Sequence, residues 1–67
     1  MTTTYIPNKL REYRKKAGLR QRDVADYLGL ESTDRISRWE KGLSYPRVPD
    51  LFRLARLFKA QAIELYK

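Results

Sequence analysis

Hydrophobic residues recur at helical spacing in several short stretches of this chain, and no stretch alternates as a β-strand would. The clearest repeat falls at i, i+3, i+4 and i+7 and consists of Leu51, Leu54, Ala55 and Phe58. Pro49 suits the first position of this helix, and Asp50 places a negative charge in its first turn. The pattern predicts an amphipathic helix that begins at Pro49.

A helix is also predicted near the start of the chain, over about residues 7–17. Its inward face carries Leu10, Tyr13, Arg14 and Ala17. Pro7 suits the first turn, where its missing N–H costs nothing, although Asn8 could cap the same helix instead. Gly18 fits the left-handed position past the helix end. Residues 1–6 have no helical pattern and are predicted to form a flexible arm.

Two short helices follow, and a glycine ends each of them. The first begins near Arg20 or Gln21 and ends before Gly29, and its apolar stripe consists of Val24, Ala25 and Leu28. The next spans about 33–41 and ends before Gly42. Its inward side is predicted to carry Ile36, Trp39 and Glu40.

The last third of the chain completes the fold. Residues 43–48 are predicted to be a loop, because Pro46 and Pro49 prevent a continuous helix. A short helix over about 61–66 offers Ile63 and Leu65 for packing. We therefore expect an all-α fold of five short helices, with residues 7–67 forming one domain.

Charge points to the kind of partner that this domain would bind. The chain has 67 residues, with 15 Lys and Arg against 8 Asp and Glu, which gives a net charge of +7. So basic a domain favours a polyanionic partner such as nucleic acid. Because histidine and cysteine are absent, we expect no metal site, cofactor or catalytic residue. We therefore expect that the protein is not an enzyme. No apolar run approaches the roughly 20 residues of a membrane span, so a cytoplasmic location is expected.

Several spacings together resemble one known family. They are G-L-x-Q-x-x-V-A-x-x-L-G at 18–29, I-S-R-W-E-K-G at 36–42, and Pro46 followed by Leu51-x-x-Leu54-Ala55. This pattern is similar to the lambda-repressor-like (Xre/Cro-type) helix-turn-helix DNA-binding family, from about Leu10 to Tyr66. The resemblance implies a compact five-helix domain whose second and third helices form the helix-turn-helix. It also implies that the protein is a nucleoid-associated repressor of a bacterium or phage. Such repressors bind palindromic operators as dimers.

The resemblance assigns structural and reading roles to individual residues. Gln21 would contact a phosphate and brace the third helix, and Arg14 would pair with Glu40. The small or apolar structural positions are Ala25, Gly29, Ile36 and Trp39. The exposed side of the third helix would read base edges in the major groove through Thr33, Asp34, Ser37 and Arg38.

Two departures from the family pattern bear on these assignments. The path from Gly29 to Ile36 is one residue longer than is usual, so which of residues 32–35 faces the bases stays open, and Arg35 joins the candidates. Ser32 or Thr33 could cap the third helix. Arg20 stands where the family commonly has a Ser or Thr cap, and an Arg there could reach a phosphate.

Phosphate contacts need cations, hydroxyls or helix N-termini at the edges of the groove. The candidates flank the helix-turn-helix on both sides and are Arg20, Gln21, Arg22, Lys41, Ser44 and Tyr45. Arg47, which follows Pro46, is a candidate for the minor groove. Among the base-reading candidates, Arg38 fits best, since a guanidinium can grip guanine O6 and N7 together.

An alternative function is an antitoxin or protein-interaction adaptor that keeps the fold without reading DNA. Its partner would be a toxin or a regulator protein. The apolar outer patch available for this consists of Leu43, Tyr45, Phe52, Leu57 and Tyr66. A homodimer through the last helix would use the same residues, so the sequence does not separate the two.

Overall fold

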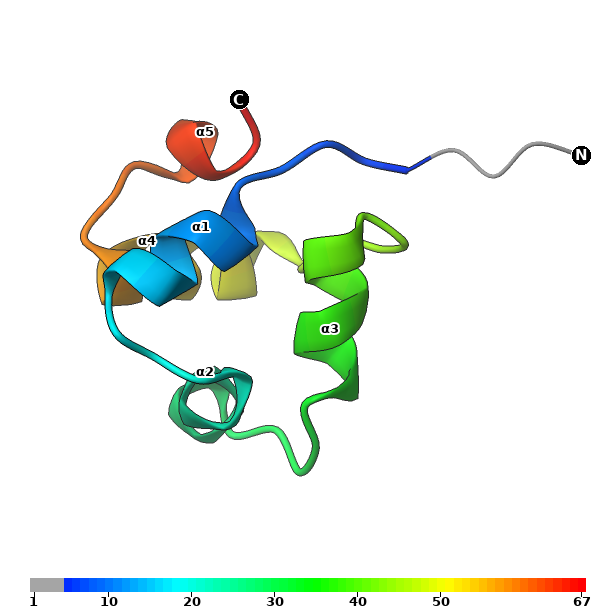
Figure 1. Ribbon diagram of the computed structural model, residues 1–67, viewed down its shortest axis with the longest axis vertical. Coiled ribbons are helices and arrows are strands. Elements are labelled where there is room, and N and C mark those ends of the chain that lie inside the picture. The colour runs from blue at the N-terminus through cyan, green and yellow to red at the C-terminus, as the bar shows by residue number, and fades with distance from the viewer. Residues whose placement is uncertain (1–4) are drawn as a thin grey trace, which may run out of the picture.

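The computed structural model describes residues 5–67, which form five helices and no strand (Figure 1). The helices are α1 (Leu10–Lys16), α2 (Gln21–Leu28), α3 (Asp34–Lys41), α4 (Val48–Phe58) and α5 (Ala62–Leu65). In Figure 1, α2 is seen end-on below α1, and α3 runs vertically beside them. The predicted all-α fold of five short helices is confirmed for the described residues.

The start of α1 was predicted three residues too early. The helix begins at Leu10, whose backbone N–H donates to Asn8 Oδ1 at 3.0 Å, so Asn8 and not Pro7 supplies the contact at the helix start. The N–H of Lys9 donates to the carbonyl of Leu65 at 2.8 Å, so the chain there is held against α5. The other ends differ by one residue or so, and α4 begins at Val48, which makes Pro49 its second residue.

Extended chain before α1 is bound to the end of α3. The backbone N–H of Ile6 donates to the carbonyl of Gly42 at 2.9 Å, and Asn8 Nδ2 donates to the carbonyl of Trp39 at 2.9 Å. Four of the six residues of the predicted flexible arm, 1–4, lie outside the described residues. Its last residue, Ile6, is not free but is hydrogen-bonded and half-buried.

All five helices contribute to one core. Its buried members are Leu10, Val24, Ala25, Ile36, Trp39, Leu54, Ala55, Phe58 and Leu65. Trp39 is only 5% exposed, so it belongs to the core and is not available for stacking on bases. The four residues of α5 cannot form a stable helix alone, and the fully buried Leu65 fixes them to the domain.

Four helices end in a left-handed residue. Three of these residues are the predicted glycines, of which Gly42 has φ +79° and the backbone of Ile6 directly beside it. The fourth is Lys59, at the end of α4, with φ +54°. That last position could not be predicted from the sequence, because a lysine does not mark a left-handed turn as a glycine does.

Candidate nucleic-acid interface

The helix-turn-helix consists of α2, α3 and the five residues 29–33 between them. Ala25 is fully buried, so only a methyl side chain faces the core at this position of α2. The N–H of Leu30 donates to the carbonyl of Ala25 at 2.8 Å and closes the end of α2. In α3, which follows the turn, Ile36 and Trp39 are buried. The unit is therefore held by the core on its inner side.

A buried polar network fixes α3 to α1 and α2. Arg14 Nε donates to Glu40 Oε2 at 2.6 Å, and its Nη2 donates to Oε1 at 3.3 Å. Gln21 Nε2 donates to the same Oε1 at 3.1 Å, and Arg14 Nη1 donates to the carbonyl of Leu19 at 2.8 Å. The Arg14 and Glu40 side chains are only 10% and 6% exposed. Gln21 therefore braces α3, as the resemblance implied, and the network sets how α3 projects.

The outward side of α3 is polar and accessible. Helical spacing places Asp34, Arg38 and Lys41 opposite the buried Ile36 and Trp39, and all three are exposed. Ser37 lies at the edge of this side and is half-buried. Short polar groups and a forked cation are thus presented on one face of a rigidly held helix.

The start of α3 resolves part of the ambiguity in the turn. The helix begins at Asp34, and its N–H donates to Ser32 Oγ at 3.3 Å, so Ser32 and not Thr33 supplies the cap contact. Thr33 precedes the helix and is half-buried. Arg35 lines a hollow of about 350 Å³ with residues 29–32, on the side of the turn. Of the four residues in question, Asp34 is the one on the outward face of α3.

A polar groove of about 180 Å³ separates α1 from α3. It is lined by Arg11, Arg14, Gln21, Ser37, Glu40 and Lys41. Sequence reasoning did not single out Arg11, although it stands one turn before Arg14 on the same helix. The fold brings it to the groove opposite Lys41, so that two exposed cations flank the bracing network.

The Arg22 side chain is hydrogen-bonded to other groups of the same helix-turn-helix. Its guanidinium donates to Asp26 Oδ1 at 2.6 and 3.0 Å, to the carbonyl of Leu30 at 3.2 Å and to that of Glu31 at 3.0 Å. These bonds clamp the turn of the helix-turn-helix. A phosphate contact by Arg22, which remains a prediction, would have to compete with four internal hydrogen bonds.

Arg20 and Asp23 replace the missing cap of α2. Asp23 Oδ2 accepts the backbone N–H of Arg20 at 2.8 Å and its Nε–H at 3.3 Å. The backbone hydrogen bond first, and then the guanidinium, lower the pKa of Asp23 below its ordinary value of 3.8. The Arg20 side chain is 83% exposed, so it remains accessible from solvent at the start of α2.

The residues after α3 that were predicted to contact DNA differ in their surroundings. Arg47 is exposed at the start of α4, and Ser44 is half-buried. Tyr45 is 68% exposed and lines an apolar hollow of about 240 Å³ with Ile6, Pro46, Leu51 and Tyr66. Its surroundings are therefore apolar on one side, unlike those of the other phosphate candidates.

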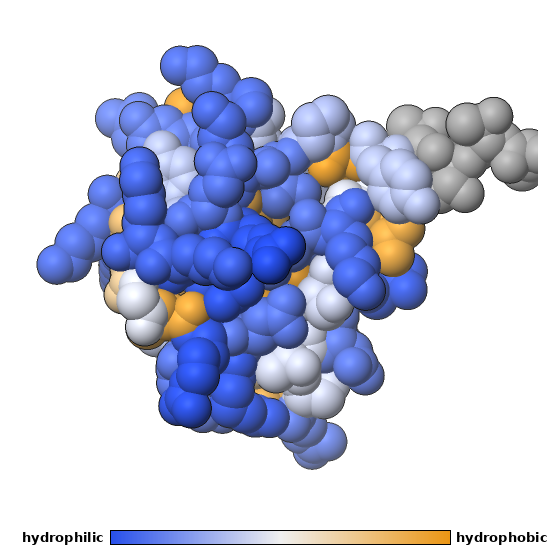
Figure 2. Space-filling model, in the orientation of Figure 1, coloured by the Kyte–Doolittle hydropathy of each residue, from blue (hydrophilic) through white to orange (hydrophobic). Residues whose placement is uncertain are grey.

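The cations of α3 form no ion pair among the described residues. Within residues 5–67, four ion pairs form, and they involve Arg14, Arg20, Arg22 and Arg53. Arg35, Arg38 and Lys41 form none of them, so these cations are available to an anionic partner. Figure 2 shows hydrophilic side chains over most of the face in view, with small hydrophobic areas between them.

The described residues form neither a metal-binding cluster nor a membrane-spanning helix. Residues 5–67 hold no group of three or more His, Cys, Asp or Glu side chains placed to bind a metal ion. No helix in that range has the length and apolar character needed to cross a membrane.

Comparison with known proteins identifies the family. The family model described as helix-turn-helix matches residues 10–65, a range that includes every helix and all of the bracing network. The search of curated proteins gave no match. The family supports sequence-specific DNA binding in general terms, and its matched range contains the α2–turn–α3 unit and the core residues. The chain therefore belongs to the lambda-repressor/Xre-like helix-turn-helix family.

Proposed function

We propose that this protein is a transcriptional repressor of bacterial, phage or mobile-element type that binds operator DNA with α3 in the major groove. The observation that carries the proposal is the exposed, unpaired Arg38 on the outward side of a helix whose orientation the Arg14–Glu40–Gln21 network fixes. Such a regulator acts in the cytoplasm, at the nucleoid, and it needs neither a cofactor nor a catalytic group.

Base reading falls to the outward side of α3. A guanidinium donates two hydrogen bonds to guanine O6 and N7, which gives Arg38 the largest part in selectivity. Asp34 can accept from cytosine N4, and Ser37 can bond to a base or a phosphate. Thr33 and Arg35 lie beside this face and would read bases or phosphates at its edge.

Phosphate contacts fall to cations and polar groups around that face. Arg11 and Lys41 flank the polar groove, Arg20 and Gln21 stand at the start of α2, and Ser44 and Tyr45 follow α3. Arg47 would reach the minor groove. Such contacts raise the affinity for all sequences alike and make it depend on salt.

The test is selection of bound fragments from random duplex DNA, followed by affinity measurements on two variants. Arg38→Ala is expected to flatten the preference at one base position, at a cost of about 1–3 kcal/mol for the best site. Gln21→Ala is expected to weaken binding to every sequence alike. Failure of the selection to enrich any sequence would contradict the proposal, and an Arg38→Ala variant that keeps its operator preference would contradict the role of Arg38.

Operator binding as a dimer is supported by apolar side chains on the surface of α4, α5 and the preceding loop. Tyr45, Val48, Phe52 and Ile63 are each at least 60% exposed. Burying them against a second copy would remove this apolar area from water. A two-fold symmetric operator with half-sites about one helical turn apart, bound by two copies, is the expected result. A single bound copy on an asymmetric site would contradict it.

The same apolar surface supports the second candidate, an antitoxin or adaptor. Here the exposed side chains would bind a toxin or regulator protein in place of a second copy. Phe52→Ser separates the two, because it would weaken operator binding if the dimer forms there. If Phe52→Ser abolishes binding to a co-purified protein and no DNA sequence is enriched, the adaptor is favoured.

A further inference from the structure

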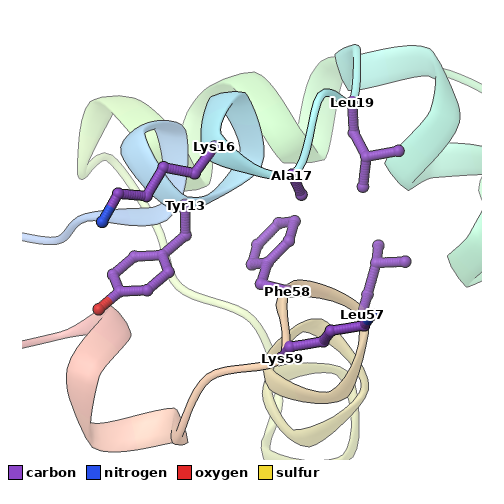
Figure 3. A pocket seen from close by; sticks show the side chains of 7 residues that line it. All are labelled: Tyr13, Lys16, Ala17, Leu19, Leu57, Phe58 and Lys59. Carbon is purple, nitrogen blue, oxygen red and sulfur yellow. The ribbon is translucent and has the colours of Figure 1, made fainter.

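A second groove lies between the C-terminal ends of α1 and α4. Its volume is about 400 Å³, and Figure 3 shows the seven residues that line it: Tyr13, Lys16, Ala17, Leu19, Leu57, Phe58 and Lys59. Neither α3 nor any of the predicted DNA-contacting residues is among them. The proposed repressor function therefore makes no use of this groove.

The floor of the groove is apolar. Leu19 and Leu57 point toward one another at one end, Phe58 points toward Ala17, and the ring of Tyr13 forms the other end (Figure 3). Leu19 and Leu57 are only partly buried, so part of the apolar surface around the core is open to solvent here. Apolar side chains of a ligand would gain free energy by covering it.

Two cations stand at the rim. Lys16 Nζ lies 5.4 Å from the centre of the Tyr13 ring, a distance at which the ring attracts the ammonium group and holds it beside the floor. Lys59 is exposed, and neither lysine forms an ion pair with any residue from 5 to 67. The nearby carboxylate of Glu64 is at hydrogen-bond distance, 3.5 Å, from the Tyr13 hydroxyl. The two lysines therefore complement negative charge, whereas the Glu64 carboxylate beside Tyr13 opposes it at that end of the groove.

Lys59 occupies a backbone conformation that disfavours it. Its φ of +54° and ψ of +44° are left-handed, and the other left-handed residues in the described chain are all glycines. A side chain in this conformation meets its own backbone, which is why glycine is the usual residue at such a helix end. A lysine at this position is less stable than a glycine would be, but it places a cation at the rim of the groove.

We propose that this groove docks an acidic amphipathic helix of a partner protein. Its apolar side chains would cover Leu19, Leu57 and Phe58, and its carboxylates would pair with Lys16 and Lys59. Helices with one apolar face are commonly recognised in this way by apolar grooves. A small molecule fits less well, because such ligands are usually enclosed over most of their surface, whereas Lys16, Ala17 and Lys59 leave this groove open.

The test uses the whole chain and a fluorescent peptide of about 15 residues, long enough to populate a helix in water. The peptide carries leucine at i, i+3 and i+7 and glutamate on the flanking positions. Binding is measured by fluorescence anisotropy, and melting temperature is measured on the same samples. Lys59→Gly is the informative variant, and Lys9→Gln is its control, since Lys9 is exposed and does not line the groove.

Lys59→Gly is expected to raise the melting temperature while it weakens peptide binding roughly two- to fivefold, as for the loss of an exposed ion pair. Lys16→Gln should weaken binding by a similar factor, and Lys9→Gln should leave it unchanged. A peptide with lysine in place of glutamate, or serine in place of leucine, should not bind.

Three results would overturn the proposal. One is an acidic peptide that fails to bind, or binds equally to wild type and Lys59→Gly. Another is a salt dependence of DNA binding that falls in Lys16→Gln or Lys59→Gly, because these lysines would then be phosphate contacts. The third is self-association of the chain that Lys59→Gly abolishes, because a second copy would then fill the groove. None of these results bears on α3, so the repressor proposal is tested separately.

Discussion

Glu40 is the residue at which three helices meet. Its carboxylate accepts hydrogen bonds from Arg14 in α1 and from Gln21 in α2, and its side chain is almost fully buried. A buried ion pair contributes little net stability compared with apolar residues, but it is costly to break in half. Its value here is geometric, because a carboxylate with two fixed donors allows few orientations of α3.

Removing only one partner should therefore be worse than removing both. Glu40→Leu leaves the Arg14 guanidinium buried without its anion, and we expect a loss of about 3–5 kcal/mol in unfolding free energy. Arg14→Met together with Glu40→Leu should lose less. Urea unfolding followed by circular dichroism measures both, with Arg53→Ala in the exposed pair with Asp50 as control. If the losses of Arg14→Met alone and Glu40→Leu alone added up to the loss of the double variant, the pair would not act as a unit.

Gly42 is constrained by a close approach as well as by its backbone angle. A Cβ atom there would lie 2.6 Å from the carbonyl oxygen of Ile6, whereas one at Gly29 would meet nothing within 4 Å. We expect Gly29→Ala to cost about 1–2 kcal/mol from left-handed strain alone. Gly42→Ala should cost clearly more, because the segment before α1 must also move. Equal losses in urea unfolding would mean that the close approach of Ile6 adds nothing to the cost of a side chain at Gly42.

At the scale of elements, α2 shows how a helix start can be rebuilt without its usual cap. Arg20 has no side-chain acceptor to offer the helix, yet the carboxylate of Asp23 reaches back to the N–H of Arg20. Arg22, one turn before Asp26, ties the other end of the same helix to the turn. Two of the cations expected to bind phosphate therefore also hold α2 in place.

The cap of α2 should weaken in acid. The folded state lowers the pKa of Asp23, so the ionised carboxylate stabilises the fold above the unfolded value of 3.8. That contribution is lost as the pH falls through the lower folded value. Wild type should thus be more stable than Asp23→Asn near neutral pH, and the difference should shrink below about pH 4. Thermal unfolding at several pH values measures it, and a constant difference would contradict the proposed cap.

At the scale of the whole molecule, the net charge of +7 acts in opposite directions on folding and on binding. Like charges repel within the compact state, and salt screens that repulsion. Salt also releases the partner, because each neutralised phosphate contributes about −0.9 to the slope of log affinity against log salt concentration.

Added sodium chloride should therefore raise the melting temperature of the free protein while it weakens operator binding. Differential scanning fluorimetry and anisotropy titrations over the same salt series measure the two effects. Lys9→Gln, which removes an exposed charge outside the predicted DNA-contacting residues, should reduce the first effect with little change in the second. A melting temperature that falls with salt would mean that the ion pairs outweigh the general repulsion.

This very small domain has three distinct surfaces. The outward side of α3 is polar and cationic, the surface around Phe52 and Ile63 is apolar, and the groove beside Lys59 combines both characters. In the proposed assembly, DNA would cover the first surface, a second copy the apolar surface and an acidic helix the groove. The adaptor alternative differs only in what covers the apolar surface.

The sequence alone determined the helices, the core and the family, because hydrophobic spacing and glycine stops are local properties of the chain. The inward residues of α4, the burial of Trp39 and the pairing of Arg14 with Glu40 were all anticipated from spacing and resemblance. The start of α1 at Leu10 depends on the folded chain, since Lys9 and Asn8 bind partners in α5 and α3 that are distant in sequence. The clamp made by Arg22, the position of Arg11 and the groove at Lys59 likewise depend on contacts between elements, which no local pattern encodes.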